Sequence, residues 1–283
     1  QIEEVVIQLS ANTDLRMVAL YGGLGPKTQI EILEKGVDII VTTPGRFLDI
    51  YRKGKILTKE IKTLVLDEAD KMMDMGFMPQ IRSILEIIPR KRQNLLFSAT
   101  FGERIDRFAA EFLEFPERVE VTPQATTAET IAQVKYLVPN IKTKLSLLAH
   151  LFKNEEINRA IIFTRSRKNA EEVFGFLSHR SYGEVRVLHA NKGQNTRINS
   201  IEDFKGGDVR ILVATDVASR GLDVTMVSHV VNFDVPLIYE DYVHRIGRTG
   251  RAEKEGKAIS FVNPAETYHF DKIEEIIRMK VEE

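Results

Sequence analysis

Two carboxylates stand directly after an apolar run in the first half of the sequence. Leu64–Leu66 leads into Asp67 and Glu68, and Asp70 follows after one alanine. An aspartate at the end of a buried strand can hold Mg²⁺ on a nucleotide, and a neighbouring glutamate can orient or activate the attacking water. The alternative is a solvated acidic turn that begins a helix, because carboxylates stabilise the positive end of a helix dipole. These residues alone leave both interpretations open.

Hydroxyl, glycine and arginine residues follow three other apolar runs. Ser98 and Thr100 follow Leu95–Phe97, where their hydroxyls could bridge to carboxylates on a neighbouring strand. Gly22–Gly23 and Thr43–Arg46 end two further runs. Glycine lets a backbone approach a phosphate closely, and Thr and Arg supply hydrogen-bond donors. Each segment is also compatible with an ordinary turn or a helix cap.

The densest signal is a run of arginines in the second half. His244–Arg251 places Arg245, Arg248 and Arg251 within eight residues and spaces them with glycines. Guanidinium groups this close repel one another unless a polyanion or carboxylates lie between them. A purely structural role would need several acidic partners. We interpret the segment as a phosphate-recognition element that includes an arginine finger on a γ-phosphate.

A second polar segment, Ala214–Asp223, follows the apolar run Val209–Val213. It offers a hydroxyl, a guanidinium and carboxylates at the end of one strand. The alternative is a capped helix followed by a surface Arg-Gly turn. Weaker signals of the same kind are Phe163–Arg165 and Gln194–Arg197.

These polar segments end apolar runs that alternate with amphipathic helical stretches, which is the βαβ pattern of a mostly parallel sheet. Ligands of such sheets bind beyond the carboxyl ends of the strands. The strands predicted in the first half are Met17–Leu20, Asp38–Val41, Thr63–Leu66, Asn94–Phe97 and Arg118–Val121. Those predicted in the second half are Val134–Val138, Ala160–Phe163, Val185–Leu188, Val209–Val213, His229–Asn232 and Ala258–Val262. Helices are predicted at Lys142–Phe152, Arg167–His179 and Asn195–Phe204.

The alternation lapses once, in a small and polar stretch near the middle of the chain. We therefore expect two lobes, residues 1–122 and 133–283, joined by a linker at residues 123–132. A length of 283 residues also suits two lobes better than a single core.

Composition narrows the class of protein without giving a function. Hydrophobic residues make up 43% and charged residues 29%, and 40 basic against 41 acidic residues give a net charge of −1. That balance argues against a basic tail that coats nucleic acid, but it allows a local phosphate-binding groove. The absence of cysteine excludes disulfides and thiolate metal sites. The six histidines lack H-E-x-x-H spacing, and no apolar run approaches the ~18 residues of a membrane span.

Taken together and in this order, the motifs resemble those of the DEAD-box family of superfamily 2 helicases. The resemblance covers nearly the whole chain, and the sequence is most similar to those of bacterial members. Asp67–Asp70 matches the tetrad that gives the family its name, and Ser98–Thr100 matches its Ser-Ala-Thr motif. Three segments match the main motifs of the second lobe, namely Ile161–Arg165, Ala214–Asp223 and His244–Arg251.

The resemblance implies an α/β fold of two tandem RecA-like, doubly wound parallel-sheet lobes. It implies an ATP-dependent RNA helicase that unwinds short RNA duplexes or remodels RNA–protein complexes by ATP-driven closure of the lobes. The implied cofactors are ATP and Mg²⁺. The implied partner is RNA, single-stranded or in short duplexes and largely independent of sequence, with no membrane association. The implied location is cytoplasmic.

The resemblance also implies roles for single residues. In catalysis Asp67 would hold Mg²⁺ through water and Glu68 would position the hydrolytic water. Arg248 and Arg251 would reach the γ-phosphate, and Asp223 would contact the ribose side of the nucleotide. Coupling between the lobes would involve Asp70, Ser98, Thr100 and His244. RNA contacts would be made by Gly23, Thr43, Gly45, Arg46, Arg165, Thr215, Arg220 and Gly221.

One departure from the family pattern concerns the nucleotide site. The sequence contains no G-x-x-x-x-G-K-[ST] loop, and it opens at Gln1 inside a helical apolar pattern. We therefore expect a sequence cut before the phosphate loop and an incomplete first lobe with exposed apolar faces at Leu64–Leu66 and Leu95–Phe97. Residues 1–283 alone should not hydrolyse ATP. The second lobe, from about Ile131, should fold by itself.

Two other classes of protein remain open. A related motor that moves along DNA would share the sheets and the arginines, and a comparison of ATPase stimulation by RNA and by DNA would separate the two. A non-catalytic clamp on RNA or on a protein is favoured by the missing phosphate loop, whereas Glu68, Arg248 and Arg251 argue against it. Sequence preceding Gln1 in the gene would discriminate between these classes.

Overall fold

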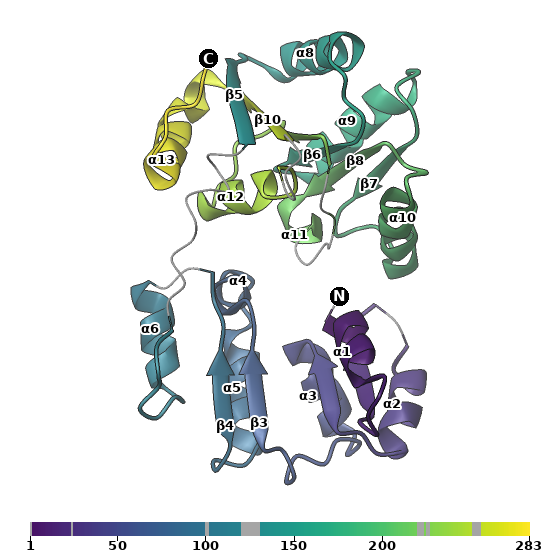
Figure 1. The fold of residues 1–283 in the computed structure, drawn as a ribbon, viewed down its shortest axis with the longest axis vertical. Helices are drawn as coiled ribbons and strands as arrows, with labels where there is room; N and C mark the ends of the chain where they lie inside the picture. The colour runs from purple at the N-terminus through teal and green to yellow at the C-terminus, as the bar shows by residue number, and fades with distance from the viewer. Residues whose placement is uncertain are drawn as a thin grey trace. The chain divides into compact units, whose positions relative to one another are not determined.

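A computed structural model describes residues 2–23, 25–99, 102–119, 131–219, 224, 227–250 and 256–283. The chain divides into two units, residues 1–120 and residues 121–283, and each is described by itself (Figure 1). Both units consist of parallel strands connected by helices. The α/β class predicted from the alternation of apolar runs and amphipathic stretches is therefore confirmed.

The first unit contains two parallel strand pairs flanked by helices. β1 (Met17–Leu20) pairs with β2 (Ile39–Thr42), and β3 (Thr63–Leu66) pairs with β4 (Gln93–Leu96). The described helices of this unit are α1 (Ile2–Ser10), α2 (Pro26–Glu34), α3 (Pro44–Arg52), α4 (Ala69–Asp74), α5 (Met78–Ile87) and α6 (Glu103–Ala110). Both strand pairs contribute to one apolar cluster, since Leu20, Ile50 and Leu64 all belong to it.

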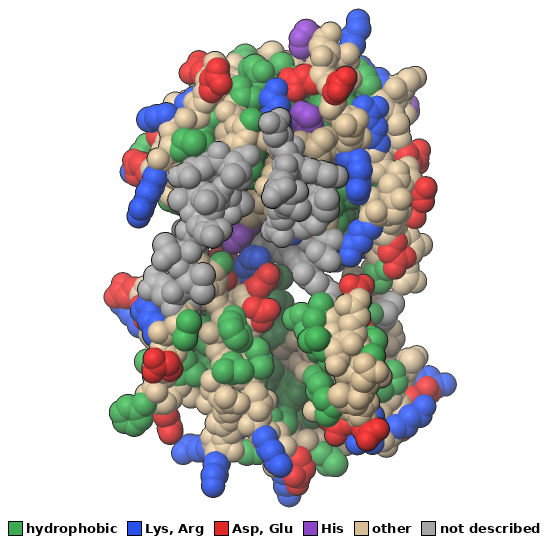
Figure 2. All heavy atoms as spheres, in the orientation of Figure 1, with side chains coloured by type: hydrophobic (Ala, Val, Ile, Leu, Met, Phe, Trp, Pro, Cys, Tyr) green, Lys and Arg blue, Asp and Glu red, His purple; other side chains and the backbone are tan. Residues whose placement is uncertain are grey.

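Apolar side chains remain at the surface of the first unit. Val65 in β3 is 52% exposed and Phe97, just after β4, is 54% exposed, whereas Leu66 is buried. Strand residues alternate between the two faces of a sheet, so the exposed apolar faces predicted for Leu64–Leu66 and Leu95–Phe97 exist only in part. Figure 2 shows further hydrophobic side chains gathered on the visible face of this unit, and α1 buries none of its residues.

The second unit is built on a six-stranded sheet in which all strands are parallel, in the order β5-β10-β9-β6-β8-β7. The strands are β5 (Ile131–Leu137), β6 (Ala160–Thr164), β7 (Val185–Leu188), β8 (Ile211–Thr215), β9 (His229–Asn232) and β10 (Gly256–Val262). The helices are α8 (Ile141–Asn154), α9 (Arg167–Ser178), α10 (Gln194–Gly206), α11 (Asp216–Ser219), α12 (Glu240–Ile246), the short 3₁₀ helix η1 (Pro264–Glu266) and α13 (Thr267–Ile277).

Apolar clusters cover both faces of this sheet, which explains why its central strands are continuous apolar runs. In β6, Ile162 packs in the cluster that contains residues of α8 and α9. Its neighbours Ile161 and Phe163 pack in the opposite cluster, with Phe204 of α10. Every residue of β6, β8 and β9 is buried. Among the helices that the structure describes, none combines the length and the apolar character needed to cross a membrane.

Strand boundaries follow the predicted runs closely, and β1, β3, β7 and β9 begin and end where predicted. β5 begins earlier than predicted, because Ile131 already pairs with Gly256. Residues 131–132 of the predicted linker are therefore strand, and residues 123–130 lie outside the described residues, so the predicted lobe boundaries remain a prediction. β8 begins at Ile211, since Val209 is buried without pairing in the sheet. Of the predicted strand Arg118–Val121, residues 118–119 are not in a strand and the rest is not described.

We expect residues 131–283, produced alone, to fold and to unfold cooperatively. The six-stranded sheet, its helices and the apolar clusters on both of its faces all lie within these residues. Thermal unfolding followed by circular dichroism checks this expectation. A gradual, non-cooperative loss of signal would contradict it.

Candidate functional site

The turns after β3 and β4 are tied together at one edge of the first unit. The backbone N–H of Phe97 donates to the carbonyl of Leu66 at 2.8 Å, and that of Ala69 donates to the carbonyl of Phe97 at 3.0 Å. The carboxylate turn and the hydroxyl turn are therefore neighbours, as the sequence predicts. Ser98 is half-buried there, and Thr100 lies outside the described residues.

Glu68 adopts a left-handed backbone conformation, with φ 52° and ψ 47°. Such a conformation costs a residue other than glycine roughly 1–3 kcal/mol, and residues of this kind cluster at active sites. The bend ends β3 and starts α4, so that Asp67 and Glu68 are both exposed. Asp67 Oδ1 accepts from Glu68 N at 2.9 Å, and Glu68 Oε1 accepts from Lys71 Nζ at 3.0 Å. Sequence reasoning missed this backbone conformation, because it is unusual for glutamate.

The exposed carboxylates are suited to bind Mg²⁺, which needs few protein ligands. They are less suited to a metal ion whose ligands all come from the protein. Among the described residues, no group of three or more His, Cys, Asp or Glu side chains is placed to hold a metal ion. Mg²⁺ usually keeps several waters and binds through one or two carboxylates together with substrate phosphates. The exposed carboxylate of Asp67 at the end of β3 fits that kind of coordination.

The turns predicted to contact RNA in the first unit follow β1 and β2. The backbone N–H of Thr43 donates to the carbonyl of Leu20 at 3.1 Å, which joins the carboxyl ends of the two strands. Gly23 has a φ of 88°, which favours glycine. Thr43 and Gly45 are exposed, and a Cβ added at Gly45 would meet no atom within 4 Å, so a ligand can approach this backbone. Arg46, in the first turn of α3, is half-buried.

Arg245 of α12 is a buried cation at the carboxyl edge of the second sheet. Its side chain is 2% exposed, and Nε and Nη2 donate to the two carboxylate oxygens of Asp216 at 2.6 and 2.7 Å. Nη1 donates to Asn232 Oδ1 at 3.1 Å and to the carbonyl of Asp234 at 2.8 Å. The guanidinium also lies 5.1 Å from the centre of the Phe163 ring. The interpretation of the whole arginine run as a phosphate-recognition element is therefore wrong for Arg245, which has an internal carboxylate partner.

Arg248 follows α12 and is half-buried. Its carbonyl accepts from the backbone N–H of Val227 at 3.3 Å. The turn that comes next needs glycine, because Gly250 has a φ of 66° and a Cβ there would lie 2.5 Å from Ile131 Cγ1. Gly250 thus lies directly against Ile131 of β5. Arg251 lies outside the described residues.

His244 lies on α12 with its side chain 30% exposed, and its Nδ1 is 3.7 Å from Asp241 Oδ1. The coupling roles predicted for His244, Asp70, Ser98 and Thr100 require contacts between the two units. These roles remain predictions.

The predicted RNA contacts Arg165 and Thr215 lie at the ends of neighbouring strands, where Thr164 pairs with Thr215. Thr215 is only 7% exposed, whereas the side chain of Arg165 is 36% exposed. Arg165 is therefore the more accessible of the two to a ligand. The remaining predicted residues of this edge, which lie outside the described residues, are Arg220, Gly221 and Asp223.

Sequence reasoning missed the aspartate that organises this edge, Asp234. Its Oδ2 accepts from the backbone N–H of Arg165 at 2.9 Å and from Asn169 Nδ2 at 2.8 Å, and its Oδ1 accepts from Lys144 Nζ at 3.2 Å. Burial raises the pKa of this carboxyl, but the charge of Lys144 and these hydrogen bonds outweigh burial and hold the pKa below its usual range. The available signal was the apolar run His229–Asn232, which leads into a carboxylate as β3 does.

Comparisons with known proteins agree with this arrangement of motifs. The sequence profile described as DEAD/DEAH box helicase matches residues 1–108, and the profile described as helicase conserved C-terminal domain matches residues 143–253. The chain is 40% identical over 282 residues to the DEAD-box ATP-dependent RNA helicase RhpA of Helicobacter pylori. It is 41% identical, also over 282 residues, to the DEAD-box ATP-dependent RNA helicase CshA of Geobacillus kaustophilus. Both matches cover 100% of this chain.

Solved structures extend the likeness to the fold. Dbp5 of S. cerevisiae bound to RNA and ADP BeF3 has a TM-score of 0.85 and is 30% identical, with 99% of this chain and 72% of that chain covered. A DEAD box protein from the hyperthermophile Methanococcus jannaschii has a TM-score of 0.52 and is 34% identical, with 99% and 77% covered. This chain belongs to the DEAD-box helicase family. The predicted family and the predicted fold of tandem RecA-like lobes are confirmed.

The chain spans 56% of the length of RhpA and 60% of the length of CshA. The DEAD/DEAH profile falls within the first unit, and the helicase C-terminal profile falls within the second. In the first unit the carboxylates follow β3, and in the second unit the arginine run begins in the last turn of α12.

We expect Arg245→Met to lower the free energy of unfolding of residues 131–283 by about 3–5 kcal/mol, because the change leaves Asp216 without its buried cation. Urea unfolding measures the difference. Arg186→Met is the matched control, since the Arg186 side chain is 39% exposed and pairs with Glu184 at the surface. The control substitution should lower the free energy of unfolding by less than about 1 kcal/mol. Equal effects of the two substitutions would show that the Arg245 pair does not stabilise the fold.

Proposed function

We propose that the protein is an ATP-dependent RNA helicase, which unwinds short RNA duplexes or remodels RNA–protein complexes by ATP-driven closure of two lobes. The names of the relatives RhpA and CshA support the activity, and the Dbp5 structure with RNA and ADP BeF3 supports both ligands. The observation that carries the proposal is the pair Asp67 and Glu68, set by a left-handed backbone beside the Ser98 turn. The lobes of the proposal are residues 1–122 and 133–283, with a linker between them.

The carboxylate pair divides two tasks at the nucleotide. Asp67 would hold Mg²⁺ through water, and the bound ion would neutralise charge on the phosphates. Glu68 would accept a hydrogen bond from the attacking water and position it. Lys71 already donates to one oxygen of this carboxylate, which restricts its orientation and leaves the other oxygen for the water.

The second unit would complete the nucleotide site. Arg248 and Arg251 would stabilise negative charge on the γ-phosphate as it is transferred, and Asp223 would contact the ribose side. The buried pair of Arg245 and Asp216 supports this proposal, because it fixes α12 to the sheet and so fixes the start of the segment that carries Arg248. Coupling of ATP binding to lobe closure would pass through Asp70, Ser98, Thr100 and His244.

RNA would be held mainly through phosphates and 2′-hydroxyls, so that recognition would be largely independent of sequence. The exposed backbone at Gly45 and the accessible guanidinium of Arg165 support this mode of binding. ATP and RNA would each favour binding of the other, because both would stabilise the same closed state. The proposed contacts are Gly23, Thr43, Gly45, Arg46, Arg165, Thr215, Arg220 and Gly221. A cytoplasmic location is part of the same proposal.

Glu68→Gln should lower RNA-stimulated ATP hydrolysis by about 10²–10⁴-fold, the usual contribution of a general base, while ATP and RNA binding stay nearly unchanged. Glutamine keeps the size of the side chain and an acceptor for Lys71, but it loses the negative charge. Steady-state phosphate release and equilibrium binding, measured on the gene product, separate the two effects.

Glu103→Gln is the matched control, because Glu103 is an exposed glutamate in the first turn of α6 that pairs with Arg107. This variant should hydrolyse ATP like the wild type. Near wild-type hydrolysis by Glu68→Gln would remove Glu68 from the proposed role.

A further inference from the structure

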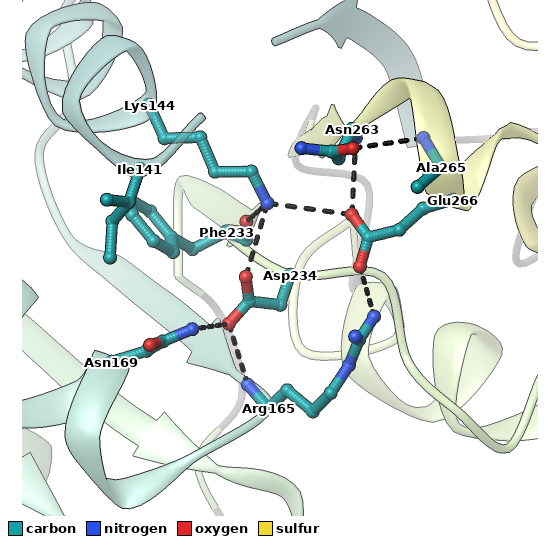
Figure 3. Close-up of a pocket in the computed structure, with 9 residues that line it drawn as sticks. All are labelled: Ile141, Lys144, Arg165, Asn169, Phe233, Asp234, Asn263, Ala265 and Glu266. Carbon is teal, nitrogen blue, oxygen red and sulfur yellow. Dashed lines mark hydrogen bonds and ion pairs between the residues drawn. The ribbon is translucent and has the colours of Figure 1, made fainter. Parts of the chain in front are cut away.

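A pocket of about 380 Å³ opens at the carboxyl ends of β6, β9 and β10 (Figure 3). Four charged side chains line it: Lys144, Arg165, Asp234 and Glu266. Figure 3 shows the two cations and the two carboxylates pointing toward one another. The two positive and two negative charges balance, so the four residues together carry no net charge. What the cluster does is hold Arg165 in place.

Arg165 is anchored through one nitrogen of its guanidinium. Nη2 donates to the carbonyl of Val235 at 3.0 Å and to the carboxylate of Glu266. A guanidinium has five N–H donors, so these two bonds leave three, on Nε and Nη1, without a partner in the part of the chain that the structure describes. The side chain is 36% exposed. The guanidinium is therefore fixed on one side and available to a ligand on the other.

Arg245 shows what a fully internal arginine looks like in the same unit. It is 2% exposed and makes four hydrogen bonds, two to Asp216, one to Asn232 and one to the carbonyl of Asp234. Arg165 makes half as many side-chain bonds and stays accessible. The contrast indicates that the partners of Arg165 orient its guanidinium but leave some of its N–H donors available to a ligand.

Glu266 is itself held from two sides. Its Oε2 accepts from the backbone N–H of Asn263 at 3.2 Å, which closes the capping box of η1. The same oxygen lies 3.7 Å from Lys144 Nζ. The Glu266 side chain is only 12% exposed. Its other oxygen, Oε1, is thereby directed at Arg165.

Lys144 and Asp234 fix the backbone below the same arginine. The Lys144 side chain is 6% exposed, and its Nζ donates to the carbonyl of Phe233 at 2.7 Å and to Asp234 Oδ1 at 3.2 Å. The second oxygen of Asp234 accepts from the backbone N–H of Arg165. One carboxylate thus positions the backbone of Arg165, the other positions its guanidinium, and Lys144 contacts both carboxylates.

We infer that Glu266 is a positioning residue for RNA binding, which anchors Nη2 of Arg165 and turns the remaining N–H groups toward an RNA phosphate. This inference rests on the proposed function and deepens it. A freely rotating arginine loses rotamer entropy when it binds, whereas an anchored arginine has lost it beforehand. Charge-assisted bonds from the free side of the guanidinium to a phosphate would then form without rearrangement.

The test is a double-mutant cycle on the affinity of the gene product for fluorescently labelled single-stranded RNA, with a non-hydrolysable ATP analogue present. Arg165→Ala should weaken binding about tenfold, as expected for the loss of a charged hydrogen bond. Glu266→Ala should weaken it about threefold to tenfold. The double variant should bind like Arg165→Ala alone, because Glu266 acts through Arg165. Glu266→Gln, which keeps an acceptor oxygen, should lose less than Glu266→Ala.

Asn140→Ala controls for a general loss of local stability. The Asn140 side chain caps α8, the helix that carries Lys144, by accepting from the backbone N–H of Thr143 at 3.0 Å. Removal of this cap destabilises the region without touching the four charged residues. RNA affinity should stay within twofold of the wild type.

Three outcomes would overturn the inference while the proposed function stands. Tighter RNA binding by Glu266→Ala would show that Glu266 competes with the phosphate. If Glu266→Ala lowers RNA affinity as much in the Arg165→Ala background as it does in the wild type, then Glu266 does not act through Arg165. If Asn140→Ala lowers RNA affinity as much as Glu266→Ala does, the effect of Glu266→Ala comes from a loss of local stability. Absence of RNA binding by the wild type would instead contradict the proposed function, and the inference with it.

Discussion

A buried guanidinium has to be neutralised where it lies, and this requirement arranges the carboxyl edge of the second sheet. Arg245 meets it with the carboxylate of Asp216, the side chain of Asn232 and the carbonyl of Asp234. These partners stand at the ends of β8 and β9, and the ring of Phe163 in β6 lies beside the guanidinium. One side chain therefore ties three strand ends to α12. Loss of Asp216 would leave the buried charge of Arg245 without its carboxylate partner.

The two units position their polar groups by different physical means. In the second unit, buried cations on helices pair with carboxylates that follow strand ends. Arg245 of α12 pairs with Asp216, and Lys144 of α8 pairs with Asp234 and Glu266. In the first unit, backbone hydrogen bonds join the turns after β3 and β4, and the left-handed conformation of Glu68 turns the chain there. A strained backbone is tolerated where the surrounding structure determines it. Asp67 and Glu68 in the first unit and Arg165 in the second unit are exposed.

Much of the fold could be predicted from the sequence, because strands and helices leave local patterns. β7 was predicted correctly because Val185–Leu188 is a short run of apolar residues interrupted only by Arg186. The start of β8 was missed because buried Val209 extends the apolar run without pairing. The pairing of Arg165 with Glu266 could not be predicted, since 101 residues separate them. For the same reason no local pattern shows which arginine of the run is buried. The conformation of Glu68 depends on its surroundings and was missed as well.

The most direct test of the proposed activity is ATP hydrolysis by the gene product in the presence of single-stranded RNA or of DNA with the same sequence. The helicase proposal predicts that RNA stimulates hydrolysis and that DNA does not, because the 2′-hydroxyl distinguishes the two ligands. Equal stimulation by DNA would favour a DNA motor built on the same lobes. Hydrolysis that responds to neither nucleic acid would contradict the proposed function.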